Sequence, residues 1–185
     1  FTAAALTLVE DGKAVHFPLS NGTQGVRGMA ISPDGRYLAV AHVLSRYQVP
    51  TTQLDRGWMN TNAVTVIDTD EPDKPHPVLL DDPDAGAANP WGVSFSEDGG
   101  KLFVTHAGTH ELSVIDFPAL LERMKREGRS NEPVSERLGF LHGLRTRIAL
   151  PLNGPRSVAS DGKNVYVAGY FSDSLAEISL KDVCK

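Results

Sequence analysis

The chain has 185 residues, of which 41% are hydrophobic and 22% charged, so it carries enough apolar material for a packed core. Its formal net charge of −5 argues against nucleic-acid binding, which needs a basic surface to neutralise phosphates. No apolar run approaches the ~20 residues of a membrane-spanning helix, no signal peptide is visible, and the single cysteine, Cys184, excludes an intrachain disulfide.

The N-terminal region predicts a β-hairpin. Apolar and polar residues alternate over 4–10 and again over 13–19, with Asp11-Gly12 between the two segments. Asp-Gly between alternating segments is a strong hairpin signal, because glycine adopts positive φ without steric cost. We expect these residues to form the third and fourth strands of a repeating unit.

The same hairpin pattern then recurs three times. Residues 25–42, 89–106 and 154–169 each contain a short apolar run, an Asp-Gly pair and an alternating run. The Asp-Gly pairs begin at 34, 98 and 161, a spacing of 64 and then 63 residues. Internal repeats of this kind indicate a fold built from equivalent units.

Further strands follow each repeated hairpin. Third strands are predicted at 62–69, 110–117 and 173–180, and fourth strands at 76–82 and 147–152. The pattern therefore predicts an all-β protein made of four-stranded antiparallel units. Four-stranded units in series are the blades of a β-propeller.

The predicted blades divide the chain at residues 24, 88 and 153. Residues 1–24 end one blade, 25–88 and 89–153 form two blades, and 154–185 begin another. This makes about three blades, fewer than the ~4–8 of a closed ring, so we expect part of a larger propeller, of about seven blades for example. The remaining blades, or another chain, would complete the ring.

Two insertions explain why the spacing exceeds the ~40–45 residues of a typical blade. The first covers residues 43–61 and contains Arg, Tyr and Trp side chains. The second covers 118–146, and its start, Pro118 to Gly128, predicts a short helix with an apolar stripe. That helix either decorates the rim or docks a partner.

The second repeat resembles the YVTN-type β-propeller repeat, a Tyr-Val-Thr-Asn strand followed by a Val-Ile-Asp strand. Phe103-Val104-Thr105-His106 stands at the tetrad, and Val114-Ile115-Asp116 stands at the second motif. The resemblance extends over most of the chain and implies the propeller fold. The consensus Asn is replaced by His42 and His106 in two repeats and by Gly169 in the third.

Blade geometry predicts one functional face. In a propeller the loop that enters the first strand and the loop that leaves the second lie on the same side. The expected ligand- or partner-binding residues are located in these loops and in the first insertion: Arg27, His42, Arg46, Tyr47, Arg56, Trp58, Trp91, His106 and Arg156. Tyr, Trp and Arg are the residue types that dominate binding hot spots.

The two repeated histidines admit two interpretations. His106 and His110 flank a three-residue turn, and imidazoles that point the same way could bind a metal ion. Alternatively, His42 and His106 hydrogen-bond neighbouring loops, as the consensus Asn does. No carboxylate or cysteine completes an obvious ligand set in the sequence.

Two functions remain open from the sequence. Residues 45–68 resemble bacterial exported YVTN proteins whose propeller accompanies a c-type cytochrome or di-haem peroxidase-like domain. This resemblance implies a non-catalytic scaffold in the periplasm or outside the cell, with haem c held by a C-terminal or partner domain and no cofactor in this chain. The alternative is a lactonase-like hydrolase that uses the same face, although no catalytic motif is present.

Overall fold

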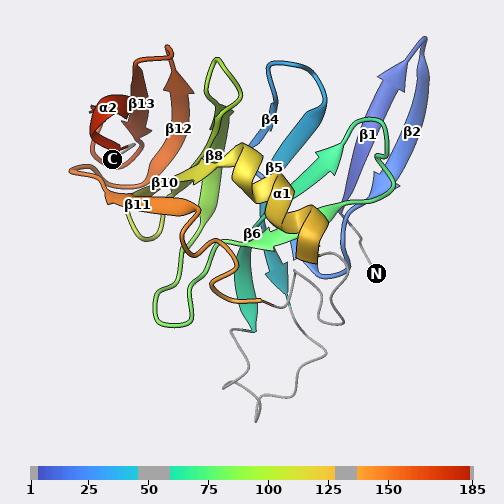
Figure 1. The fold of residues 1–185 in the computed structure, drawn as a ribbon, viewed down its shortest axis with the longest axis horizontal. Coiled ribbons are helices and arrows are strands. Elements are labelled where there is room, and N and C mark those ends of the chain that lie inside the picture. The colour runs from blue at the N-terminus through green and yellow to red at the C-terminus, as the bar shows by residue number, and fades with distance from the viewer. Residues whose placement is uncertain (1–3, 46–58, 128–136, 184–185) are drawn as a thin grey trace.

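The computed structural model describes residues 4–45, 59–127 and 137–183, and antiparallel β-sheets dominate this part of the chain. The sheets follow one another along the sequence and stand side by side, as Figure 1 shows. Within the described residues, no helix has the length and apolar character that crossing a membrane would demand.

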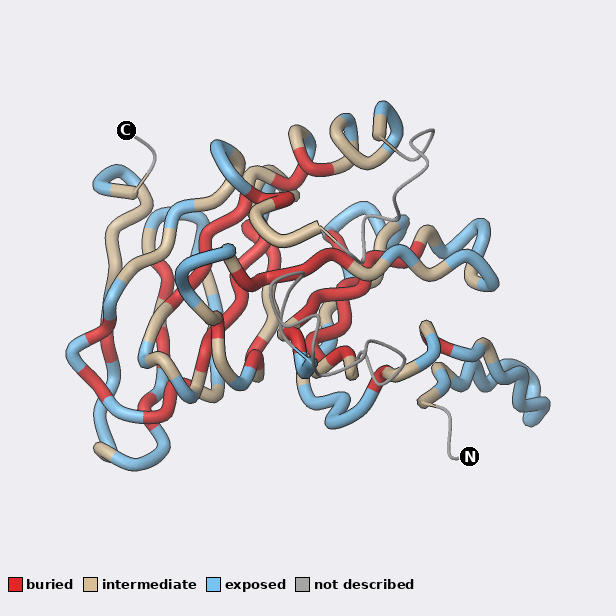
Figure 2. Tube along the Cα trace, turned by 90° about the horizontal axis from the view of Figure 1, so that it is seen from below, coloured by how far each residue is buried: buried red, intermediate tan, exposed pale blue. Residues whose placement is uncertain are grey.

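The N-terminal hairpin forms as predicted. Strands β1 (Ala5–Glu10) and β2 (Lys13–Pro18) pair with each other in a two-stranded sheet. Both turn residues have positive φ, 49° at Asp11 and 74° at Gly12, which suits a two-residue hairpin turn. In Figure 2 the hairpin beside the N-terminus is largely exposed, whereas the buried stretches gather in the central sheets.

In the first complete sheet, two short strands together form the innermost strand position. Its strands are β3 (Thr23–Gln24), β4 (Met29–Ile31), β5 (Tyr37–Ser45), β6 (Asn60–Asp68) and β7 (His76–Leu79). Both β3 and β4 pair with β5, and residues 25–28 lie between them. The sequence pattern did not predict β3, because two residues are too few to show alternation.

The second and third sheets repeat the arrangement. The second has the order β11–β10–β9–β8, and the third has the order β12–β13–β14. Their strands are β8 (Pro90–Phe95), β9 (Lys101–His106), β10 (Glu111–Asp116), β11 (Arg145–Ala149), β12 (Pro155–Ser160), β13 (Asn164–Gly169) and β14 (Ser174–Ser179). A short helix not predicted from the sequence, α2 (Leu180–Val183), follows β14.

The first two Asp-Gly turns between first and second strands are equivalent. In the first, Gly35 has φ of 75° and donates its backbone N–H to the Ser32 carbonyl, while Ser32 Oγ donates to Asp34 Oδ1. The turn at 96–99 repeats these hydrogen bonds, and the turn at 160–162 is one residue shorter. These carboxylates therefore have a structural role, which the hairpin prediction assigned to them.

The core consists of layers between adjacent sheets. Strand β9 shows this clearly, because Leu102 and Val104 pack toward the first sheet and Phe103 packs toward the third. Alternate residues of a strand point to opposite faces, so Leu102, Phe103 and Val104 are all buried because β9 has a neighbouring sheet on both sides. The inner strand β8 contacts both β4 and β12.

Helix α1 (Phe117–Glu127) confirms the predicted helix and packs onto the core. Asp116 caps its start by accepting a hydrogen bond from the Ala119 backbone N–H at 3.0 Å. Phe117 and Leu120 are buried in the layer between the first and second sheets, and the Phe117 ring packs edge-on against Phe95. The apolar stripe therefore packs against the core, with Leu121 and Met124 partly buried beside Leu120.

The first insertion is shorter than the sequence suggested. Residues 43–45 continue β5 and residues 60–61 belong to β6, so regular pairing extends beyond the predicted strand ends. The expected binding residues Arg46, Tyr47, Arg56 and Trp58 lie outside the described residues.

These sheets are blades of a β-propeller. Each complete blade has four main antiparallel strands, and its innermost strand lies beside that of the next blade. At the two ends of the series, apolar side chains remain exposed, such as Met29 and Ile31 on β4 and Leu175 on β14. Such faces are normally covered in a propeller.

Candidate functional site

Three of the predicted binding residues come together at the starts of the inner strands. The Arg27 guanidinium carbon lies 4.3 Å from the centroid of the Trp91 ring, and that of Arg156 lies 4.1 Å from the same ring. Arg156 also lies 3.8 Å from the ring centre of Tyr170. We call Arg27, Trp91, Arg156 and Tyr170 the rim stack. Arg27 and Tyr170 are exposed, while Trp91 and Arg156 are partly buried.

Glycines next to the stack allow the inner strands to approach closely. A Cβ on Gly28 would lie 2.0 Å from the Trp91 carbonyl oxygen, and one on Gly92 would lie 2.8 Å from the Arg156 carbonyl oxygen. Because the neighbouring atoms are backbone, they cannot move aside as a flexible side chain would. The backbone contact places the preceding side chains, Arg27 and Trp91, within stacking distance.

We expect Gly28→Ala to reduce the free energy of unfolding by about 1–3 kcal/mol, because the methyl group forces β4 away from β8. In a Trp58→Phe background the same change should alter the fluorescence of Trp91, since Arg27 moves with its strand. Urea unfolding followed by circular dichroism measures the first effect. Gly86→Ala is the matched control, because its Cβ would meet no atom closer than 3.8 Å. Equal stability of the two variants would contradict the prediction.

His42 lies inside the protein, beneath the rim. It is fully buried, its Nε2 is 2.6 Å from Thr65 Oγ1, and its Nδ1 is 3.1 Å from the Val43 carbonyl oxygen. Burial lowers the pKa of His42 below its ordinary value. Neighbouring atoms cover the ring, so His42 is not exposed on the face where the sequence analysis expected it to bind a ligand.

His106 repeats this arrangement in the next blade. It is also fully buried, with Nε2 2.7 Å from Ser113 Oγ and Nδ1 3.1 Å from the Ala87 carbonyl oxygen. Burial, with smaller contributions from Arg145 and Arg147, lowers the pKa of His106 to about 3. The ring is neutral near pH 7 and anchors the loop before β8, which is the alternative role considered from the sequence.

The two imidazoles do not share a site. On β5, His42 is on the same side as Leu38 and Val40, which pack toward the N-terminal hairpin. On β9, His106 is on the same side as Leu102 and Val104, which pack toward the first complete sheet. Each ring therefore points toward the preceding blade and occupies a separate layer.

In the third blade, both the buried histidine and the hydroxyl residue that it bonds are replaced. Gly169 stands at the histidine position, and Ala176 stands where the other blades have Thr65 and Ser113. A Cβ on Gly169 would lie 2.5 Å from Ser172 Oγ and 3.0 Å from the Leu152 Cβ, so neighbouring side chains leave no room for a larger residue at this position. The paired replacement fits a structural hydrogen bond between the second and third strands.

The proposed metal pair is not arranged for a shared ion. Both ring nitrogens of His106 already face protein oxygens, and His110 Nδ1 accepts the Gly154 backbone N–H at 3.1 Å. His110 has a φ of 57° at the turn. In the described ranges, no three His, Cys, Asp or Glu side chains are grouped as a metal site. The hydrogen bonds favour anchoring roles for both histidines.

A buried carboxylate that the sequence analysis missed organises the loop between the first two blades. Asp81 accepts hydrogen bonds from the backbone N–H and side-chain amide of Asn62, at 2.6 and 2.9 Å, and from the Ala87 backbone N–H at 2.7 Å. Its exposed fraction is 1%. The Asp-Asp-Pro-Asp sequence gave no sign of which carboxylate would be buried.

Two arginines of β11 hold the same loop from the other side. Arg145 bonds the Leu80 carbonyl oxygen and pairs with Asp82 at 2.5 Å. Arg147 pairs with Glu111, and it also donates to the Gly86 carbonyl oxygen at 2.7 Å. Because these partners come from both blades, the charges fix the loop that carries Ala87, the acceptor for His106.

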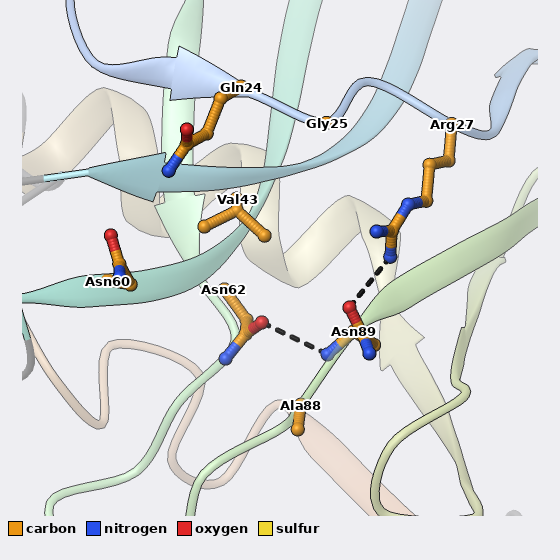
Figure 3. Close-up of a pocket in the computed structure, with 8 residues that line it drawn as sticks. All are labelled: Gln24, Gly25, Arg27, Val43, Asn60, Asn62, Ala88 and Asn89. Atoms are coloured by element: carbon orange, nitrogen blue, oxygen red, sulfur yellow. Dashed lines mark hydrogen bonds between the residues drawn. The ribbon is translucent and has the colours of Figure 1, made fainter.

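A pocket of about 460 Å³ opens between the first two blades, beside the rim stack. Figure 3 shows its lining: Gln24, Gly25, Arg27, Val43, Asn60, Asn62, Ala88 and Asn89. Arg27 precedes an inner strand and Val43 lies near the end of a second strand, so the two loop types share one face as blade geometry predicts. The sequence analysis identified only Arg27 among these residues.

Comparison with known proteins shows which proteins this chain is similar to. No protein-family model matches the chain. Hydrazine synthase subunit beta from Kuenenia stuttgartiensis is 28% identical over 174 residues, which cover 92% of this chain and 45% of that protein. The chain is similar to hydrazine synthase subunit beta. A solved structure of Kuenenia stuttgartiensis hydrazine synthase matches with a TM-score of 0.83 and 26% identity, covering 95% of this chain and 51% of the other.

Two other solved structures share the fold alone. The nidogen/laminin complex has a TM-score of 0.60 at 18% identity, and virginiamycin B lyase from Staphylococcus aureus has 0.52 at 16%. They cover 93% and 96% of this chain, and each match spans 49% of the other chain. The chain thus spans about half the length of the hydrazine synthase subunit and of these structural neighbours.

Proposed function

We propose that this chain is a non-catalytic binding propeller of an exported bacterial protein, and that its rim stack docks a redox partner that carries haem c. The similarity to hydrazine synthase subunit beta over 92% of the chain carries this proposal, because that relative is by name one subunit of an enzyme. The proposed location of the protein is the periplasm or the outside of the cell. The haem-bearing partner follows from the resemblance to exported YVTN proteins.

The rim stack has the composition of a docking surface. It combines two arginines with a tryptophan and a tyrosine, the residue types that contribute most to protein interfaces. Stacking holds both guanidinium groups in place, which reduces the entropy that they lose on binding. The exposed apolar faces of β4 and β14 offer further surfaces, for additional blades or another chain.

The hydrolase alternative has less support. It assigns acid–base roles to His42 and His106, yet both rings are fully buried and engaged by neighbouring atoms. With a pKa of about 3, His106 is not a general acid near pH 7. Among the described residues of this face, no observation favours catalysis over binding.

The test is capture of a haem protein by the tagged protein, expressed in full in its native host. We expect the purified complex to show a Soret absorbance band, and Arg156→Gln to reduce the captured haem at least tenfold. Arg36→Gln is the matched control, because Arg36 pairs with Asp68 beside a first-to-second-strand turn, on the opposite side of the blade. Thermal unfolding of each variant checks the fold.

Three results would contradict the proposal. One is the absence of a Soret band, another is equal capture by Arg156→Gln and wild type, and the third is hydrolysis of a lactone by the purified protein alone.

A further inference from the structure

The pocket beside the rim stack has a donor-rich lining with a single charge. Arg27 is the one ionisable residue among the eight that line it, and three asparagines and a glutamine provide the polar groups. A volume of about 460 Å³ lies in the ordinary range for a small-molecule site. The lining therefore has a net positive charge in a chain whose formal net charge is −5.

Two of the lining asparagines use their side-chain oxygens in hydrogen bonds, whereas Gln24 uses its Nε2 to donate to Ser45 Oγ at 3.2 Å. Asn60 accepts from Ser45 Oγ through its Oδ1 at 2.6 Å, and Asn89 accepts from Arg27 Nη1 through its Oδ1 at 2.8 Å. Within the described residues, the Nδ2 groups of both asparagines and the other nitrogens of Arg27 have no protein acceptor. Figure 3 shows the Arg27–Asn89 bond at the edge of the pocket.

The walls of the pocket are held in place before any ligand arrives. Asn62 uses its Nδ2 to bond Asp81 and its Oδ1 to accept the Asn89 backbone N–H at 3.1 Å. Asn89 is further fixed by a φ of 58°, which few residues other than glycine and asparagine adopt readily. Trp91 supports Arg27 from one side through the 4.3 Å stacking contact.

We propose that this pocket binds a carboxylate, with Arg27 as the charged partner and the free amide groups of Asn60 and Asn89 as hydrogen-bond donors. A guanidinium and a carboxylate match in geometry as well as in charge. Arg156, on the other face of Trp91, adds positive potential nearby. This inference deepens the proposed function, because Arg27 belongs to the rim stack. The carboxylate comes either from a free small acid or from an acidic side chain of a partner.

The experiment titrates the protein, expressed in full, with three probes. These are glutarate, the acidic peptide acetyl-Glu-Glu-Glu-amide, and the neutral glutaramide. Trp58→Phe leaves Trp91 as the one tryptophan of these 185 residues, so a fluorescence change that is lost on Trp91→Phe reports binding at Arg27, and isothermal titration calorimetry gives the affinity independently. We expect saturable binding of at least one acid and no binding of glutaramide. Tighter binding of glutarate identifies a free acid, and tighter binding of the peptide identifies an acidic segment.

Substitutions in the lining test whether the acids bind in this pocket. Arg27→Gln should weaken binding of the acid at least tenfold and Asn89→Ala several-fold, while Arg36→Gln should bind like the parent. If Arg27→Gln binds as tightly as the parent, or if neither acid binds, the inference is overturned. If carboxylate binding fails but the protein still captures haem, only the pocket inference is contradicted and the proposed function is retained. If haem capture fails but carboxylate binding is intact, the proposed function is contradicted and the pocket inference is retained.

Discussion

Asp81→Ala is expected to lower the free energy of unfolding by about 3–5 kcal/mol, the largest effect of any single substitution considered for this protein. Asp81 is almost completely buried and satisfies three N–H donors, two from Asn62 and one from Ala87. Removing the carboxylate leaves these donors without an acceptor, and each buried unsatisfied donor costs about 1–3 kcal/mol.

Urea unfolding followed by circular dichroism measures the loss. Asp84→Ala is the matched control, because Asp84 is in the same loop but is exposed. We expect that control to change stability by less than about 0.5 kcal/mol. Since Asn62 and Asn89 line the pocket, Asp81→Ala should also weaken carboxylate binding. Similar stabilities of the two variants would show that Asp81 does not hold the loop.

Stability is also expected to fall by about 2 kcal/mol between pH 7 and pH 5 because of His106. Burial lowers the pKa of the folded-state ring from an ordinary value of 6.5 to about 3. The unfolded chain therefore takes up a proton below pH 6.5 that the folded protein does not accept until about pH 3. The stabilisation that the neutral His106 ring gives the folded state is fully present above pH 6.5. Each pH unit below 6.5 lowers the free energy of unfolding by about 1.4 kcal/mol. His42 adds to the loss in the same direction.

Urea unfolding at pH 7, 6 and 5 tests this dependence. His106→Asn should flatten it, and should also cost about 1–3 kcal/mol at pH 7, because asparagine is too short to reach both Ala87 and Ser113. His142→Asn is the matched control, because His142 is an exposed histidine. An unaltered pH dependence in His106→Asn would show that the buried imidazole is not its source.

The strands and turns were predictable because their causes are local. Alternation of apolar residues and the Asp-Gly pairs identified the repeated hairpins, and the turn at Ser32 to Gly35 forms as expected from those few residues. Helix α1 was predicted from Pro118 and its apolar stripe for the same reason. The order of the blades followed from the repeat.

The environment of each polar side chain was not predictable from local pattern. His106 reaches Ala87, 19 positions earlier, and Arg145 reaches Asp82, 63 positions earlier. A histidine at the end of an alternating strand is compatible with a ligand site or with a buried anchor. Only the loop that folds over His106 decides between the two, because that loop excludes water and supplies the oxygens that the ring faces.

By itself, then, the sequence determined the four-stranded units and placed Arg27, Trp91 and Arg156 in equivalent positions. The tertiary structure decided that these three side chains stack, because Gly28 and Gly92 let neighbouring backbones come together. It also placed the histidines inside the protein and opened a pocket next to Arg27. The physical reason is that periodicity records which face of a strand is apolar, whereas burial and hydrogen bonding depend on atoms brought from other blades.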